Sequence, residues 1–388
     1  MKRIAERLLP GATSKRLCIY NFFVMFSVER GVFVFYLQEY GYGMSEISWL
    51  QVVFSMSLFL FELPSGTVAD VYGRAAALVL GGCLMSISLI GQYAAIGNIY
   101  AMGAFFILQA IAFSLISGSL SALLYGFLQA EGNVVLFARV YAVIQFAGSL
   151  SLGLAMIIAG ALVRWGGWPA VYTVACVSPV IGVLFILFIL KKEKMARHAK
   201  RPTINVGIFF SEVKRIAPFA FPFAMMHAAM TPYFLYASAQ FQSMGIDLAS
   251  ASTAVGFAEI LCAAGVAILI RKVPAGSQGC WAFLMLIFAV FMFFQFLYGP
   301  LMAIAAFVLC NALVLWLALA SHQFINACIE ANHLRATTLS AVSFLEMLLI
   351  SIGFTVYGYV ADHYSRQLSL QVLAFFPLGG AIMLMGRR

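Results

Sequence analysis

The stretch FELPSGTVADVYGRAAAL, residues 61–78, lies between two long apolar segments. These segments cover about residues 47–69 and 75–95, and each is long enough to cross a membrane as a helix. Two glycines in the stretch permit a tight turn, while its aspartate and arginine can cap or complement the end of a neighbouring helix. The stretch therefore predicts two membrane helices joined by a short polar turn.

The composition of the whole chain is that of a membrane protein. Of its 388 residues, 63% are hydrophobic and 10% are charged, and the mean hydropathy is +0.99. A soluble globular chain carries about 25% charged residues. Twelve helices of about 20 residues each would occupy about 240 residues, which leaves no room for a soluble catalytic domain.

Charged residues and Gly/Pro breaks divide the apolar sequence into twelve segments. We therefore predict an all-α membrane protein with twelve transmembrane helices in two six-helix halves. The expected helices cover residues 15–38, 47–69, 75–95, 99–124, 139–163, 168–190, 218–242, 249–270, 280–298, 301–325, 337–360 and 368–386.

The distribution of Lys and Arg supports the count of twelve. With the N-terminus on the cytoplasmic side, twenty of the 23 basic residues fall on that side; Arg164 and Arg366 fall outside, and Arg30 lies within the first helix. This positive-inside pattern predicts that both termini are cytoplasmic. The net charge of +9 is then explained by basic residues that set the orientation in the membrane and contact anionic lipid headgroups. Nucleic acid is therefore not expected as a partner.

A polar and basic segment separates the first six predicted helices from the last six. The chain is therefore expected to divide into an N-terminal half, residues 1–190, a cytoplasmic linker, residues 191–217, and a C-terminal half, residues 218–388. Two helical halves of similar length are typical of a transporter built from internal repeats.

Residues 66–78 resemble the signature loop between helices 2 and 3 of the major facilitator superfamily, whose pattern is G-x-L-A-D-x-x-G-R-K-x-x-L. Val68 replaces the leucine of the pattern and Ala75 replaces its basic residue. The matching residues are Gly66, Ala69, Asp70, Gly73, Arg74 and Leu78. The resemblance implies a twelve-helix transporter fold with a conformational latch on the cytoplasmic side. The latch residues would be Glu62, Gly66, Asp70, Gly73 and Arg74.

Two further stretches are similar to bacterial efflux-type members of that superfamily. SGSLSALLY, residues 117–125, looks like their S-G-x-x-x-A-L-x-Y, and RATTLS, residues 335–340, looks like their R-A-T-x-L-S. The G-P-x-x-G-G signature of many drug and proton antiporters is absent from the fifth helix. The resemblance implies a monomeric transporter in the bacterial cytoplasmic membrane that works by alternating access.

Glu29 and Arg30 are candidate site residues because they lie deep in the first predicted helix, about 21 Å along it from Lys15. An ionisable group at mid-bilayer costs about 3 kcal/mol or more. On a continuous helix two adjacent side chains point about 100° apart, so this pair need not satisfy itself. In one interpretation Arg30 contacts an anionic part of the solute and Glu29 exchanges a proton. The alternative is a structural pair that fixes helix 1 against its neighbours.

Three further acids are embedded in predicted helices. Glu259 and Glu346 fall in the middle third of theirs, where burial favours the neutral form of a carboxyl. That property suits a proton carrier, and hydrogen-bonded packing is the alternative. Glu62 lies two residues before Pro64, which frees a backbone carbonyl, so a structural or latch role is expected for it.

Polar side chains in the predicted helices are further candidates for binding the solute. His227 and His322 lie on helices that line the cavity in the superfamily, although a lone buried histidine is more often a satisfied polar residue. Gln109 and Asn311 are candidate substrate-binding residues, and Gln145, Gln240 and Gln295 are of the same kind.

Gly358, Asp362 and Arg366 repeat the spacing of Gly66, Asp70 and Arg74. By the helix count this second pattern lies on the outer side. It is expected to form a capped turn between helices 11 and 12, and an extracellular gate clamp is the competing interpretation.

The sequence contains none of the common catalytic or nucleotide-binding patterns. There is no G-x-x-x-x-G-K-[ST], no H-E-x-x-H and no G-x-S-x-G, and no cluster of His and Cys at metal-ligand spacing. We therefore expect no enzyme activity, no cofactor and no metal, and transport must be driven by an ion gradient or by the gradient of the solute.

The first hypothesis is a proton-coupled exporter of an amphipathic small molecule, such as a drug or a secreted metabolite like a siderophore. One alternative is a proton-coupled importer of a polar nutrient. An alternative of another class is a membrane sensor or assembly partner that does not transport and that binds another protein through the basic loop, residues 191–217.

Overall fold

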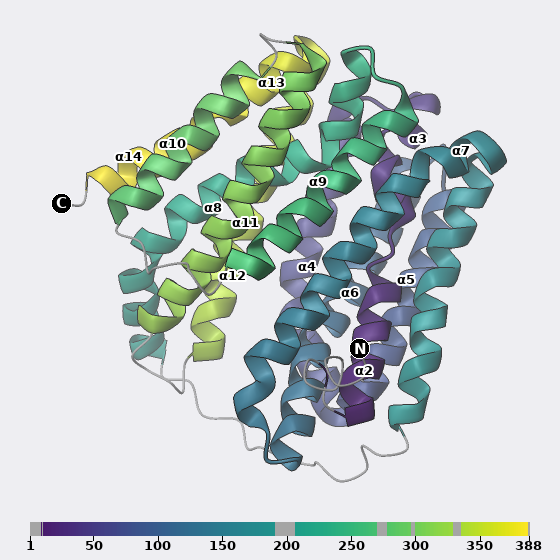
Figure 1. The fold of residues 1–388 in the computed structure, drawn as a ribbon, viewed down its shortest axis with the longest axis vertical. Helices are drawn as coiled ribbons and strands as arrows, with labels where there is room; N and C mark the ends of the chain where they lie inside the picture. Colours follow the sequence, from purple (N-terminus) through teal and green to yellow (C-terminus); the bar gives the residue numbers. More distant parts are fainter. Residues whose placement is uncertain are drawn as a thin grey trace. The chain divides into compact units, whose positions relative to one another are not determined.

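The structure is a computed structural model that describes residues 9, 11–190, 206–269, 278–295, 299–328 and 335–386. All regular secondary structure in these ranges is helical, as predicted: thirteen α-helices and two short 3₁₀-helices (Figure 1). The expected all-α membrane fold is confirmed.

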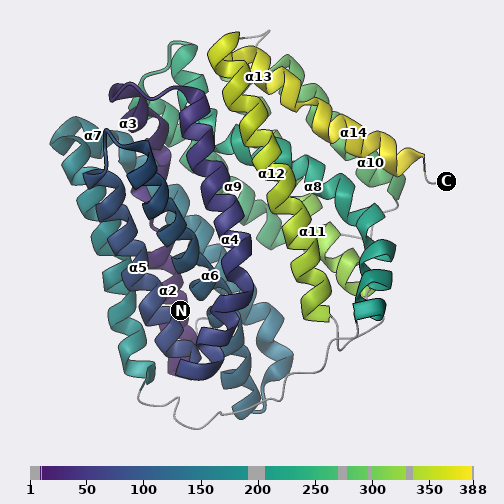
Figure 2. The ribbon, with the colours of Figure 1, turned by 180° about the vertical axis from the view of Figure 1, so that it is seen from behind.

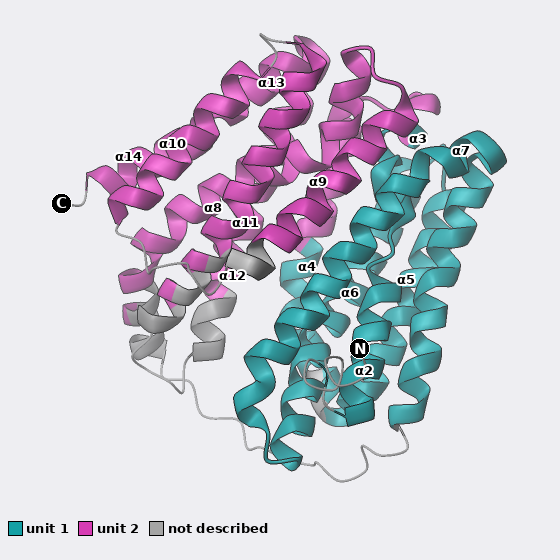
Figure 3. Cartoon of the chain, in the orientation of Figure 1, with its two compact units in different colours: residues 1–36, 57–199 teal, residues 37–56, 200–388 magenta. Residues whose placement is uncertain are grey.

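Contacts divide the chain into two compact units (Figure 3). Unit 1 consists of Met1–Tyr36 and Ser57–Ala199, and unit 2 consists of Leu37–Met56 and Lys200–Arg388. The short segment Leu37–Met56 therefore groups with the second part of the chain, although it precedes most of unit 1 in sequence.

Unit 1 contains the helices of the first part of the chain. Helix α3 and helix α4 have residues in both units. The helices are α2 (Gly11–Val24), η1 (Val28–Gly31), α3 (Phe33–Glu39), α4 (Met44–Tyr72), α5 (Arg74–Ala94), α6 (Ile99–Ala130), η2 (Val134–Leu136) and α7 (Phe137–Leu190).

Unit 2 is built around the long helix α8, against which α9, α11, α12 and α14 pack. Figure 1 shows α10, α13 and α14 together on one side of this unit, in agreement with their contacts. The helices are α8 (Val206–Ser243), α9 (Leu248–Leu269), α10 (Gln278–Phe294), α11 (Pro300–Cys328), α12 (Arg335–His363), α13 (Arg366–Leu373) and α14 (Phe375–Met385).

The described helices account for twelve membrane spans. Eight stretches are long and apolar enough to cross a membrane. One of them, Val134–Ile189, holds two spans because Gly167 inside it is not helical, with φ 62° and ψ −165°. The interrupted helix α2–α3, helix α8 and the shorter helix α10 supply the other spans.

Several helix boundaries differ from the sequence prediction. Helix α8 begins at Val206, inside the segment expected to be a linker. The last span is two helices that meet at Ala374, because Pro377 has no N–H to donate and disturbs the preceding turn. The first span is also interrupted, between Val24 and Phe33, and this break lies at the candidate site.

Candidate solute and proton site

The first span changes its helix type where the two candidate charges lie. Helix α2 ends at Val24, and Glu29 and Arg30 lie in the 3₁₀-helix η1 before α3 begins at Phe33. The expectation of a continuous helix with the two side chains 100° apart was therefore wrong. Gly31 is a poor helix former, and the valines beside the charged pair are little better. Interrupted membrane helices are typical of solute sites in secondary transporters.

Helix α7 satisfies the backbone that this break exposes. The hydroxyl of Ser178 donates to the carbonyl of Phe23 over 2.6 Å, and the hydroxyl of Ser151 donates to the carbonyl of Phe22. The amide of Asn21 in turn donates to the carbonyl of Ile144 over 2.9 Å. A non-helical backbone persists in a membrane only where neighbouring helices pair its polar groups. These side chains meet that condition.

Glu29 is buried, with 4% of its surface exposed, and its Oε2 accepts no hydrogen bond. Arg30 is half-buried, and its guanidinium carbon lies 5.9 Å from the ring centroid of Phe113 on α6. A carboxylate with an unused acceptor and a cation beside an aromatic ring are therefore adjacent in the break. Such groups can bind an ion, a proton or a charged solute.

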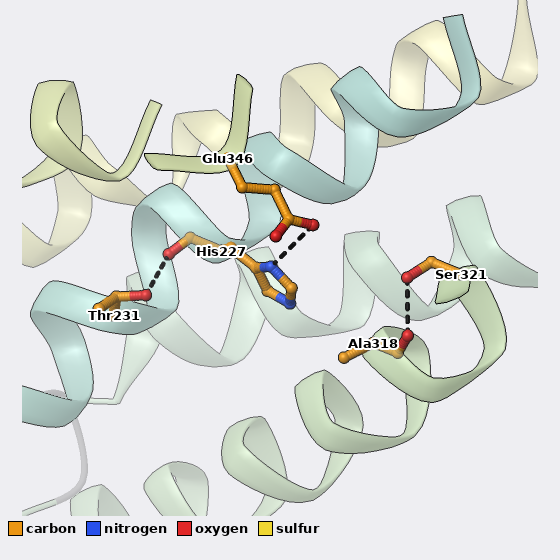
Figure 4. A network of polar contacts seen from close by, with 5 residues as sticks. All are labelled: His227, Thr231, Ala318, Ser321 and Glu346. Carbon is orange, nitrogen blue, oxygen red and sulfur yellow. Dashed lines mark hydrogen bonds and ion pairs between the residues drawn. The ribbon is translucent and has the colours of Figure 1, made fainter. Parts of the chain in front are cut away.

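Unit 2 holds a second pair of titratable side chains, which Figure 4 shows. The imidazole Nδ1 of His227 on α8 lies 3.5 Å from Oε1 of Glu346 on α12. Their side chains keep 17% and 11% of their surface exposed, so the pair is not sealed from solvent. The nearby hydroxyls of Thr231 and Ser321 donate to carbonyls of their own helices.

Close packing of α8 against α12 brings His227 and Glu346 together. Ala228 packs against Leu349 in a cluster of small and branched side chains. Gly353 lies two turns after Glu346, and a Cβ on it would come within 2.0 Å of the carbonyl oxygen of Ala228. Only glycine permits this approach of the two backbones, and the approach sets the distance between the charged side chains.

Glu259 and Asn311 form a third polar pair. Both are buried, and the Asn311 amide donates to Glu259 Oε2 over 3.4 Å from α11 to α9. The sequence predicted Glu259 as a proton carrier and Asn311 as a solute-binding residue, but it did not indicate that the two side chains are in contact.

The glutamine candidates differ in their surroundings, and the side-chain oxygen of Gln240 is buried without a hydrogen bond in the described part of the structure. Gln109 accepts a hydrogen bond from the Gln92 amide over 3.1 Å within unit 1. Gln295 accepts one from the Tyr233 hydroxyl, Gln240 is buried, and Gln145 is exposed. Gln109 is therefore already paired in this structure, and a role in binding the solute remains a prediction.

The expected cytoplasmic latch is more helical than the sequence suggested. Helix α4 continues through Pro64 and Gly66 to Tyr72, so the only sharp turn is at Gly73, with φ 99° and ψ 147°. Arg74 begins α5 and donates through Nη1 to the carbonyl of Ala122 on α6 over 2.7 Å. Arg74 thus ties this turn to the segment 117–125.

Some of the other predicted residues can be placed only in part. Glu62 is exposed on α4. Asp70 lies in α4 and His322 in α11, but their side chains lie outside the described part, as do the side chains of residues 335–340. Residues 191–205 of the predicted linker are outside it altogether.

The second glycine, aspartate and arginine pattern is arranged differently from the expected capped turn. The turn before α13 is capped by Ser365, whose hydroxyl oxygen accepts from the N–H of Leu368 over 3.1 Å. The Asp362 carboxylate accepts instead from the N–H groups of Met44 and Ser45 at the start of α4. No sequence signal indicates which remote helix an aspartate caps, so only the structure reveals this pairing.

Comparison with known proteins identifies the family. The family model described as Major Facilitator Superfamily matches residues 17–354. The chain belongs to the major facilitator superfamily. The family resemblance seen in the sequence is confirmed, and the chain is a multi-pass membrane protein of this transporter superfamily. No curated protein matches it.

Solved structures of the superfamily share the fold at low sequence identity. The nucleoside transporter NupG is 14% identical with a TM-score of 0.78, covering 96% of this chain and 99% of its own. A D-xylose-proton symporter is 12% identical with a TM-score of 0.71, covering 96% and 95%. A POT family transporter in complex with a thioalcohol-conjugated peptide is 12% identical with a TM-score of 0.78, covering 96% and 95%.

Proposed function

We propose that this chain is a proton-coupled secondary transporter that exports an amphipathic small molecule across the bacterial inner membrane. The observation that carries the proposal is the His227–Glu346 pair, which places two titratable side chains 3.5 Å apart between α8 and α12. An imidazole can both accept and donate a proton, and a partly accessible carboxylate beside it can exchange a proton with water.

The protonation state of this pair is expected to alter the packing of α8 against α12. A protonated His227 attracts an ionised Glu346, and the attraction is strong in a medium of low dielectric constant. A second proton neutralises Glu346 and removes the attraction. Because unpaired charge is costly inside a membrane, each protonation state favours a different helix arrangement, and that difference couples protons to conformation.

The solute site is proposed at the break in the first span. Arg30 would bind an anionic group of the solute, and Phe113 beside it would contact an apolar part. Glu29, Glu259 and Asn311 would be further proton-coupling or polar groups. Alternating access would rock the half 1–190 against the half 218–388 about this midplane site in a monomer, with both termini in the cytoplasm.

Export is proposed because SGSLSALLY and RATTLS resemble stretches of efflux-type members. Import of a polar nutrient is the second candidate, since one protein of the same fold is named a D-xylose-proton symporter and others are proton-dependent oligopeptide transporters.

An untargeted comparison of solutes in medium and cytoplasm tests the function. The cells would lack the protein, express it, or express Glu346→Gln; the matched control is Glu131→Gln, which changes an exposed glutamate at the end of α6. We expect a compound to accumulate in the medium with the unchanged protein and the control but not with Glu346→Gln.

The other outcomes separate the alternatives. A compound that disappears from the medium instead would establish import and overturn the proposed direction. Export that persists in Glu346→Gln would remove the pair from the mechanism and leave Glu29 and Glu259 to be tested. If no compound moves in any strain, the proposal of transport fails and a sensor role is favoured.

A further inference from the structure

The first turn of α4 depends on a side chain from elsewhere in the sequence. The first N–H groups of a helix have no partner within the helix, and the residue before the helix usually supplies one from its side chain. That residue is Gly43, which has no side chain. Glu46 accepts from the N–H of Gly43 over 2.9 Å, which leaves the next two N–H groups to be satisfied.

Asp362, at the end of α12, satisfies both of these groups. Its Oδ1 accepts from the N–H of Met44 over 2.8 Å, and its Oδ2 accepts from the N–H of Ser45 over 2.7 Å. The start of α4 and the end of α12 lie side by side in Figure 2. A carboxylate at the positive end of a helix is stabilised by charge as well as by hydrogen bonds.

The surrounding residues fit closely around this contact. Gly358 lies one turn before Asp362, and a Cβ on it would come within 2.6 Å of Ser48 Oγ and 2.9 Å of the Met44 carbonyl oxygen. The Ser48 hydroxyl shares a 2.7 Å hydrogen bond with the hydroxyl of Tyr236 on α8, whose ring stacks on that of Tyr357 at 4.1 Å. Helices α12 and α8 thus hold the first two turns of α4.

The contact joins helices that belong to opposite halves of the predicted transporter. Helix α4 is the second span and α12 is the eleventh. Both partners of Asp362 lie in unit 2, yet α4 continues into unit 1 from Ser57. If the halves rock, the start of α4 must separate from α12.

We propose that Asp362, Met44 and Ser45 form a clamp that closes the outer side of the transporter and opens during each transport cycle. This inference rests on the proposed alternating access and on the proposed orientation. Asp362 is exposed, so water replaces both N–H donors when the clamp opens. The missing side chain at Gly43 makes room for the remote carboxylate, because a Cβ there would lie 3.1 Å from Asp362 Oδ2.

Pulsed electron paramagnetic resonance on the full chain in lipid nanodiscs tests the clamp. Spin labels would replace Tyr40 and Tyr364, which are exposed on either side of the contact, after the native cysteines are changed to serine. Asp362→Ala is expected to increase the population with the longer label distance about fivefold. The matched control is Asp247→Ala, which removes a carboxylate that caps its own helix α9 through Ala249 and Ser250, and no change is expected from it.

Two further variants distinguish a clamp from an ordinary helix cap. Gly43→Ser supplies a local cap to α4, so the double variant with Asp362→Ala would recover the short distance if capping were the only role. The clamp predicts that the longer distance remains. Gly358→Ala keeps Asp362 but pushes the two helices apart, and it is expected to lengthen the distance in the same way.

The measurement needs no solute, so its outcome is separate from that of the transport assay. An unchanged distance in Asp362→Ala, or full recovery by Gly43→Ser, would overturn the clamp even if export is found. A lengthened distance in Asp362→Ala together with import of a solute would support the clamp and overturn only the proposed direction of transport.

Discussion

Two pairs of ionisable side chains are the main candidates for binding the solute and the proton. The two pairs differ in their surroundings. Glu29 and Arg30 are adjacent in sequence and share an interrupted backbone. His227 and Glu346 come from different helices and meet through their side chains. The first pair has a cation beside an aromatic ring, which suits a solute with an anionic and an apolar part. The second pair has a histidine, which suits a proton.

Replacing Arg30 is expected to weaken solute binding more than it slows turnover. Arg30→Ala removes the cation and its contact with Phe113, so we predict a rise in KM of about tenfold, which corresponds to about 1.4 kcal/mol. Arg30→Lys keeps the charge but not the planar fork and should give a smaller rise. Initial rates of transport in membrane vesicles measure both. An equal KM in all three proteins would place the solute elsewhere.

At the scale of the helix, the crossing of α8 and α12 depends on a missing side chain. The Cβ of an alanine at position 353 would lie 2.0 Å from the Ala228 carbonyl oxygen, so the helices must move apart. Overpacking of this kind costs about 1–3 kcal/mol, and it separates His227 from Glu346.

We therefore predict that Gly353→Ala lowers the thermal midpoint of the purified protein and also weakens its proton coupling. Gly265→Ala on α9 is the matched control, because nothing lies within 4 Å of a Cβ at that position. Thermal unfolding in detergent and proton uptake in liposomes give the two readouts. Normal proton coupling in a destabilised Gly353→Ala protein would show that the helix crossing does not position the pair.

The break between α2 and α3 is held by hydroxyl groups of a neighbouring helix. Changing Ser151 and Ser178 together to alanine leaves the carbonyls of Phe22 and Phe23 without these donors, at a cost of about 1–2 kcal/mol. We predict lower thermal stability and faster hydrogen exchange in residues 25–32. Ser114→Ala is the control, because that hydroxyl bonds to Ile111 of its own helix. Equal exchange in both variants would mean that the break does not need α7.

At the scale of the whole molecule, the proposed exchange of solute for protons requires that solute and protons cross the membrane in opposite directions. In liposomes with an acidic lumen, protons leave through an antiporter and drive solute into the lumen. We predict solute accumulation under that gradient and its loss when a protonophore is added. Accumulation that requires an acidic exterior instead would identify symport, and transport indifferent to the gradient would exclude proton coupling.

Much of this architecture could be predicted because a membrane imposes simple rules on sequence. Every span must be apolar over about 20 residues, and basic residues collect on one side, so the helices could be counted from composition and charge. The glycine, aspartate and arginine pattern in residues 66–78 indicated the family because its residues match the signature of the superfamily, although α4 continues through the first part of the pattern to Tyr72.

The sequence by itself determined the membrane class, the number of membrane spans, the family and several of the candidate polar side chains. Only the tertiary structure decided which of those side chains meet. It brought His227 to Glu346, Asn311 to Glu259, and Asp362 to the start of α4. It also placed the break at Glu29, where serines of α7 satisfy the freed carbonyls. The physical reason is that hydropathy depends on each residue alone, whereas a polar contact depends on how closely two helices approach.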